Sequence, residues 1–193
     1  MSSRQLLLAS LSEYKNLIES AIKEKLPLKV QTGLFKETVI YPETIGSTLL
    51  PKWQGTYELE LQELIENNAN EIDCFLNIGC AEGFYMAGIA KWLKKPCYGV
   101  DIDPRAQEAI KYLSHHNNIG NLLHYSNTIQ SGLSDCKGNL MILIDVDGNE
   151  ISVLDELTFC ISSNKDISNI LLFIETDKDT NGSNNMSAII KLL

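Results

Sequence analysis

The sequence has no cluster of positive charge and no long apolar run. Its 16 lysine and arginine residues are outnumbered by 25 aspartate and glutamate residues and are scattered along the chain. It therefore lacks the basic patch with which proteins bind nucleic acid or an anionic membrane surface. The apolar stretch at residues 6–11 is too short to span a membrane, and Glu13 follows it where a signal peptide would carry its cleavage site. We expect a cytoplasmic protein whose partners include neither nucleic acid nor a membrane.

Cysteine pairs with the spacing of a zinc site or a disulfide framework are also missing. The cysteines are odd in number and lie mostly inside apolar runs: Cys74, Cys80, Cys97, Cys136 and Cys160. Such positions are typical of buried thiols in a reducing compartment. The chain has no internal repeat, and its composition of 44% hydrophobic and 21% charged residues predicts one main globular domain.

From residue 71 onward, short apolar runs alternate with segments of helical periodicity. The strand candidates are residues 74–78, 97–101, 122–126, 140–145 and 169–175. This alternation predicts an α/β protein with a Rossmann-like, doubly wound, mainly parallel sheet of about five strands. In such a sheet the ligand binds at the carboxyl ends of the strands, near the point where the strand order reverses.

The first 70 residues have a different pattern. A charged helix that Pro27 ends carries an apolar stripe made of Leu7, Leu11, Tyr14, Ile18 and Ile22. Residues 28–54 show little periodicity, and a second helix leads into the first strand. We predict an N-terminal helical extension at residues 1–70 and a Rossmann-like domain at residues 71–193. Two interpretations of the extension stay open, a packing element and a lid over the ligand site.

A small-residue loop follows the first predicted strand. Gly79, Ala81 and Gly83 stand at positions i, i+2 and i+4, and a helix begins directly after them. A dinucleotide-binding loop needs its third glycine at i+5, where this chain has Phe84. A β-carbon at either glycine would hold the backbone away from a ligand or demand a positive φ. The spacing therefore indicates a site for S-adenosylmethionine rather than for a nicotinamide cofactor.

Asp101 stands at the end of the second predicted strand. Its distance from Gly79 along the chain is typical of the acid that accepts hydrogen bonds from the two ribose hydroxyls of an adenosyl cofactor. The alternative is a glycine turn in some other α/β protein, with Asp101 capping the helix that Pro104 opens.

Three acids follow the fourth predicted strand, Asp145, Asp147 and Glu150. As metal ligands they lack the spacing of a calcium-binding loop, so we predict no metal. As purely structural residues, Asp147 with Gly148 would form a turn and Asn149 would cap a helix, which leaves Asp145 and Glu150 unexplained. We prefer a third interpretation, in which Asp145 or Asp147 acts as a general base or orients an acceptor.

With these segments assembled, the chain resembles the class I S-adenosylmethionine-dependent methyltransferases, and within them the FkbM-type group. The stretch LIDVDGNEISVLDEL at 143–157 is similar to the fourth-strand motif of that group. The stretch GTYELEL at 55–61, ahead of NIGCAEGFY at 77–85, is similar to the opening of a related bacterial subgroup. The resemblance covers residues 55–177.

The resemblance implies methyl transfer from S-adenosylmethionine to an oxygen of a small molecule or a glycan precursor. It implies cofactor contacts by Tyr57, Glu58, Asn77, Gly79, Ala81, Gly83, Asp101 and Asn127, and catalytic roles for Asp145 and Asp147. For Asn127, which would bond the adenine amino group, a helix N-cap is the alternative. A nicotinamide oxidoreductase is a distant third possibility, which Phe84 opposes.

The chain also departs from the pattern that it resembles. Asn77 replaces the first-strand acid, Ala81 replaces the middle glycine of the loop, and Asp147 replaces a glutamate. The antiparallel strand pair that ends such domains is missing after residue 193, so either the chain is truncated or its fifth strand is an open edge that pairs with another copy. These departures keep an alternative function open, a non-catalytic cofactor-binding or scaffold domain with the same fold.

Overall fold

The computed structural model describes residues 3–25 and 27–176. Five parallel strands form one sheet in the order β3-β2-β1-β4-β5. The strands are β1 (Cys74–Ile78), β2 (Cys97–Val100), β3 (Leu123–Ser126), β4 (Gly138–Ile144) and β5 (Ile167–Ile174). The strand order reverses between β1 and β4, as expected for a doubly wound sheet. The predicted Rossmann-like sheet is therefore confirmed, whereas the predicted end of the chain at residues 177–193 lies outside the described residues.

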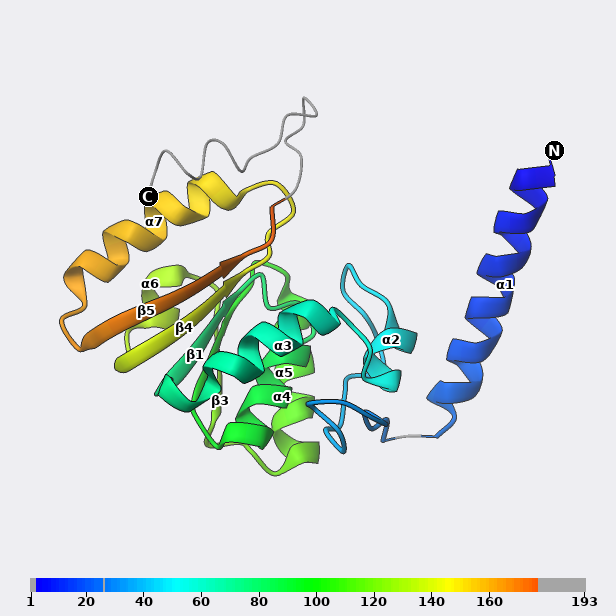
Figure 1. Cartoon of the computed structure of the whole chain (residues 1–193), viewed down its shortest axis with the longest axis horizontal. Coiled ribbons are helices and arrows are strands. Elements are labelled where there is room, and N and C mark those ends of the chain that lie inside the picture. The colour runs from blue at the N-terminus through cyan, green and yellow to red at the C-terminus, as the bar shows by residue number, and fades with distance from the viewer. Residues whose placement is uncertain (1–2, 26, 177–193) are drawn as a thin grey trace.

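Helices cover both faces of this sheet (Figure 1). Helices α4 (Phe84–Leu93) and α5 (Pro104–Asn117) pack on one face, and α6 (Ile129–Leu133) and α7 (Glu150–Ser163) pack on the other. Because side chains alternate along a strand, Phe75 of β1 joins the first core and its neighbour Leu76 joins the second. Every residue of β1 is buried, which explains why its sequence is almost continuously apolar.

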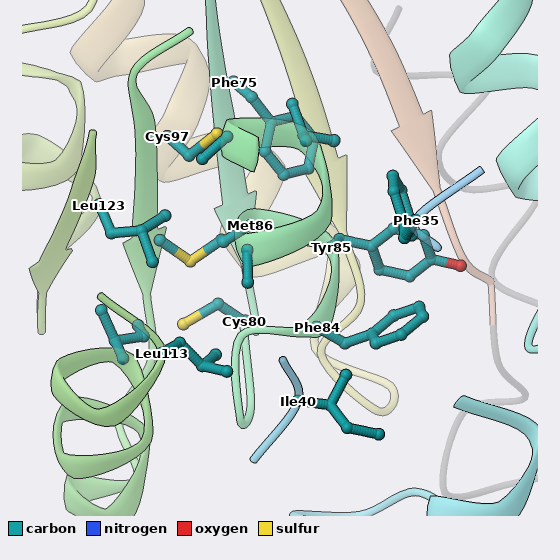
Figure 2. Close-up of a cluster of buried hydrophobic side chains, with 14 of the residues drawn as sticks. Phe35, Ile40, Phe75, Cys80, Phe84, Tyr85, Met86, Cys97, Leu113 and Leu123 are labelled. Atoms are coloured by element: carbon teal, nitrogen blue, oxygen red, sulfur yellow. The ribbon is translucent and has the colours of Figure 1, made fainter. Parts of the chain in front are cut away.

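Figure 2 shows the core between the sheet and helices α4 and α5. Met86 and Cys80 lie on the side of Leu113 and Leu123, whereas Phe84 and Tyr85 extend toward Phe35. Phe35 meets the Phe84 and Tyr85 rings edge-on, with centroids 5.6 and 6.0 Å apart. An aromatic residue of the N-terminal region thus completes the core of the sheet.

Hydrogen bonds from a side chain of α5 attach the segment at residues 28–57 to the rest of the chain. It contains α2 (Leu49–Gln54) and is followed by α3 (Leu59–Asn68) and a short 3-10 helix (Ala69–Glu71). The buried Asn117 at the end of α5 accepts a hydrogen bond from the Val39 N–H at 2.8 Å and donates one to the Val39 carbonyl at 2.9 Å. Residues on both sides of the predicted domain boundary at residue 70 share one hydrophobic core. The boundary itself stays a prediction.

Helix α1 (Ser3–Lys23) extends away from the sheet (Figure 1). Of its predicted apolar stripe, Ile22 is buried, but Tyr14 is 68% exposed; the side chains of Leu7 and Leu11 lie outside the described residues. Within residues 3–25 and 27–176, no helix combines the length and the apolar character that crossing a membrane requires.

All five cysteines are free thiols, and four of them are buried. Burial raises the pKa of the Cys80 and Cys97 thiols, so both stay protonated. The prediction of buried thiols is confirmed. At the sheet edge, β5 pairs with β4 within the described part of the chain, and its pairing with another copy stays a prediction.

Candidate functional site

A cleft of about 630 Å³ opens where the sheet's carboxyl ends meet segment 45–57. Its walls include most of the predicted site residues: Tyr57, Asn77, Gly79, Ala81, Asp101, Asn127, Asp145 and Asp147. A second, more open hollow of about 460 Å³ between α5 and β3 contains none of them. The topology therefore gathers residues from five different segments of the sequence into one site, at the edge where doubly wound sheets bind ligands.

Gly79 allows the end of β1 to pass close to the end of β4. Its φ is +79°, and a β-carbon there would lie 1.7 Å from the backbone carbonyl oxygen of Asp145. At Gly83, φ is +81° and a β-carbon would face Leu113 and Ile110 of α5. Both glycines therefore have the positive φ that the sequence predicts, and at Gly79 the Asp145 carbonyl is a further reason within the chain. Their close approach to a ligand stays a prediction. Gly83 also lies outside the lining of the cleft.

The Asp101 carboxylate is held by two backbone N–H groups. Oδ2 accepts from Ala81 at 2.7 Å, and Oδ1 accepts from Asp103 at 2.8 Å. Each oxygen keeps a lone pair for a further donor, such as a hydroxyl. Asp103, not Asp101, caps α5 by accepting from the Arg105 N–H at 2.9 Å. The alternative of Asp101 as a helix cap is therefore wrong.

Asn77 is buried and spans the gap between β1 and β4. Its side-chain nitrogen lies 3.5 Å from the Leu143 carbonyl oxygen, to which it donates a long hydrogen bond. An ionised carboxylate accepts hydrogen bonds only, so an acid at this position could not make the contact.

Asn127 is exposed on the wall of the cleft after β3. The cap of α6 is the next residue, Thr128, whose hydroxyl accepts from the Ser131 N–H at 3.3 Å. The helix-cap alternative for Asn127 is therefore wrong, and its contact with adenine stays a prediction.

The acids after β4 have separate surroundings. Asp145 is half-buried on the cleft wall, and its backbone N–H donates to the Ile78 carbonyl at 3.0 Å. Asp147 and Gly148 have φ values of 48° and 91°, which confirms the predicted turn. The buried Glu150 accepts from the Gly148 N–H at 2.7 Å, and so it stabilises that turn. Asn149 occupies the predicted N-cap position of α7, but its side chain makes no capping hydrogen bond.

These acids do not converge with other ligands on one point. Within residues 3–25 and 27–176, no group of three or more histidine, cysteine, aspartate or glutamate side chains is arranged to hold a metal ion. The absence of a metal stays a prediction.

Sequence reasoning missed a buried ion pair beside the cleft. Lys52 is 5% exposed and Glu82 is 2% exposed, and the Lys52 ammonium donates to Glu82 Oε1. Glu82 also accepts from the Ser47 hydroxyl and the Ile45 N–H, each at 2.9 Å. Through these contacts with Glu82, residues 45–52 are held next to the glycine loop. The sequence does contain a signal for this pair, since Lys52 and Glu82 are each the single charged residue inside an apolar stretch. Buried charges are rare unless they are paired.

Near this ion pair, Tyr57 and Tyr85 both contact the side chain of Glu58. The Tyr85 hydroxyl donates to Glu58 Oε2 at 2.6 Å, and Tyr57 also bonds the Glu58 side chain. Burial and these bonds to the carboxylate raise the pKa of both tyrosines far above the usual 10. Tyr57 and Tyr85 line the cleft, but Glu58 does not. Its predicted contact with a cofactor stays a prediction, and the contact that the structure shows is the one with the tyrosines.

Comparison with known proteins establishes the fold. No family model matches the chain, and no curated protein matches it. A human methyltransferase 10 domain-containing protein aligns with a TM-score of 0.56 and 11% identity, over 92% of this chain and 83% of that one. The N-terminal domain of human METTL16 in complex with SAH aligns with a TM-score of 0.51 and 12% identity, over 92% and 71%.

A precorrin 8W decarboxylase of Methanobacterium thermoautotrophicum aligns with a TM-score of 0.50 and 16% identity, over 80% of this chain and 75% of that one. At these identities the likeness shows the Rossmann-like fold of the methyltransferases and no more. Membership of the FkbM-type group stays a prediction.

Proposed function

We propose that the chain binds S-adenosylmethionine in the cleft and transfers its methyl group to an oxygen of a small molecule or a glycan precursor. The observation that carries the proposal is the position of the Asp101 carboxylate next to the glycine loop. Its Oδ2 accepts a hydrogen bond from the Ala81 N–H at 2.7 Å. A solved structure with this fold, the METTL16 domain, contains SAH. The cleft volume of about 630 Å³ lies within the range of small-molecule sites.

The residues around Asp101 suit an adenosine. The free lone pairs of Asp101 would accept from the ribose hydroxyls, in charge-assisted bonds worth roughly 1.5–3 kcal/mol each. Ile102 lines the cleft and is 93% exposed, so it offers an apolar wall to the adenine ring. Asn127 would bond the adenine amino group. The methionine part would lie along Gly79 and Ala81, toward Tyr57 and Asn77.

When bound, the cofactor supplies an activated methyl group, and the chain supplies position and a base. Holding the acceptor in line with the methyl group contributes up to about 7–11 kcal/mol to catalysis. The half-buried Asp145, at the carboxyl end of β4, would take the proton of an acceptor hydroxyl; Asp147 is the second candidate.

The charge of the cleft supports a neutral acceptor. Asp145, Asp147 and Glu156 all line it, and Lys52 is the one lysine or arginine among the described lining residues. A phosphate-rich acceptor such as nucleic acid would meet repulsion there, whereas a hydroxyl group would find acceptors. We therefore retain the proposals that nucleic acid is not a partner and that the acceptor is a small molecule or glycan precursor.

One observation favours a second function, that of a non-catalytic cofactor-binding domain. Asn77 removes the negative charge that the class commonly places beside the sulfonium, and its amide instead joins β1 to β4. Such a domain would bind the cofactor without turnover.

Calorimetry on the full chain tests the proposal. We expect S-adenosylmethionine and SAH to bind and NAD to bind far more weakly, because the loop spacing does not form the pyrophosphate turn. Tighter binding of NAD than of SAH would refute the cofactor assignment. Binding of SAH with no methyl transfer to any sugar or small hydroxyl acceptor in a panel would favour the second function.

A further inference from the structure

The cleft contains one cation among many carboxylates. Lys52 lines it together with Asp101, Asp145, Asp147 and Glu156. S-adenosylmethionine and SAH both end in an α-carboxylate, which loses solvation when it enters a cleft and needs a compensating cation or N–H donors. Lys52 is the charged donor that the described cleft lining offers for this purpose.

The Lys52 ammonium is fixed in one position. Beyond its ion pair with Glu82, it donates to the Ser47 hydroxyl at 2.8 Å and lies 4.6 Å from the centroid of the Tyr57 ring. An ammonium group has three N–H donors, and Glu82 and Ser47 take two of them. One donor remains for the side on which Ser47, Lys52 and Tyr57 face the cleft.

Glu82 positions this ammonium without entering the cleft. Its carboxylate accepts from Ile45, Ser47 and Lys52 but is not part of the lining. Because Glu82 follows Ala81 directly, the pair places Lys52 against the glycine loop, 5.4 Å from the Phe84 ring at the start of α4. The positive end of the α4 dipole favours an anion at the same place.

We infer that Lys52 binds the α-carboxylate of the cofactor's methionine moiety and that Glu82 is the residue that positions it. This inference rests on the proposed function. It makes segment 45–57 part of the cofactor site, and it assigns the carboxylate subsite to a residue that lies outside both the glycine loop and the sheet.

The test compares SAH with its decarboxylated analogue, which differs only by the α-carboxylate. The parent chain should bind SAH roughly 10- to 100-fold more tightly than the analogue, as expected for a charge-assisted bond. In the double variant Lys52→Met with Glu82→Gln, which leaves no buried charge unpaired, that ratio should fall close to one through loss of SAH affinity alone. Titration calorimetry on the full chain measures both ligands.

A surface ion pair provides the matched control. Lys95 and Asp73 lie 3.7 Å apart before β2 and β1, at the opposite end of the strands from the cleft. The double variant Lys95→Met with Asp73→Asn also removes one positive and one negative charge. It should keep the parental ratio of SAH affinity to analogue affinity. A thermal melt of each variant checks that it is folded.

The outcomes separate the inference from the proposed function. A parent chain that binds neither ligand refutes the proposed function. A parent that binds both ligands equally well overturns the inference and leaves the proposed function standing, and this result needs no variant. Equal weakening of both ligands in the Lys52 double variant would also overturn the inference, because it would make the pair a support of the segment only.

Discussion

The glycine loop at residues 79–83 and the segment at residues 45–57 line the same cleft, but different interactions determine their shapes. The loop follows a buried strand and has positive φ at Gly79 and Gly83, so its own residues dictate its path. Segment 45–57 has little regular structure apart from α2, and contacts with distant residues, Glu82 above all, hold it in place. The glycine loop can therefore be predicted from neighbouring residues in the sequence, whereas the position of segment 45–57 cannot.

The largest expected effect comes from Gly79→Ala. The new methyl group would meet the Asp145 carbonyl, and neither strand can retreat without breaking the β1–β4 ladder. We expect a loss of more than about 4 kcal/mol in the free energy of unfolding, so that the chain fails to fold. Soluble yield and urea denaturation measure it.

Gly46→Ala is the matched control in segment 45–57. Gly46 also has a positive φ, +75°, but nothing lies within 4 Å of its β-carbon position. We expect a cost of about 1–2 kcal/mol from the backbone alone. If Gly79→Ala and Gly46→Ala lowered the free energy of unfolding equally, the distinction between the glycine loop and segment 45–57 would be contradicted.

Next in size is Glu82→Gln. Without the carboxylate, Lys52 stays buried and unpaired, and breaking such a pair typically costs about 3–5 kcal/mol. We expect a lower midpoint of urea denaturation and faster proteolysis within segment 28–57. If the variant matches the parent in both measurements, the ion pair does not hold the segment in place.

Asp145→Asn tests the chemistry once an acceptor is known. We expect turnover to fall roughly 10²–10⁴-fold, with SAH affinity nearly unchanged, because a general base acts on the acceptor. Glu150→Gln is the structural counterpart, since its carboxylate holds the Gly148 turn; it should reduce stability and leave the folded enzyme active. A loss of SAH affinity in Asp145→Asn would instead place Asp145 among the cofactor contacts.

Asp101→Ala should weaken SAH binding by roughly 2–4 kcal/mol, through loss of the charged acceptor for two ribose hydroxyls. Calorimetry measures the binding, and a thermal melt detects any effect of losing the Ala81 and Asp103 contacts. Asp103→Ala is the control, because that residue caps α5 outside the cleft lining. Unchanged SAH affinity in Asp101→Ala would assign Asp101 to the loop structure alone.

The smallest effect is expected on α1. Tyr14 and Leu17 are 68% and 64% exposed, so changing both to serine removes no buried contact. We expect the free energy of unfolding to change by less than about 0.5 kcal/mol per residue. A larger loss would show that these side chains are covered in solution, where a second copy could be detected by sedimentation.

The sheet was predictable because each of its strands is a short apolar run between helical patterns. The predicted range of β1 matches the observed strand, and those of β2 and β3 differ by one residue at one end. The larger shifts are at the starts of β4 and β5, where polar residues blur the boundary. Asp101 and Asp145 were expected at the site because parallel strands bring their carboxyl ends to one edge, whereas Asn127 was implied by the family resemblance; all three line the cleft. The contacts of Glu58 with Tyr57 and Tyr85 were not predictable, because nothing local distinguishes an acid that faces the cleft from one that accepts a hydrogen bond from a tyrosine.

The parallel sheet, the glycine loop and the acids at the strand ends can be predicted from the sequence, since each follows from periodicity or from the backbone freedom of a single residue. Three features become visible only in the folded chain: Lys52 meets Glu82, Asp103 rather than Asp101 caps α5, and the Asp145 carbonyl leaves no room for a β-carbon at Gly79. The physical reason is the range of the interactions. Propensity and periodicity act within a few residues, whereas a buried charge is stabilised by whichever partner the fold brings to it.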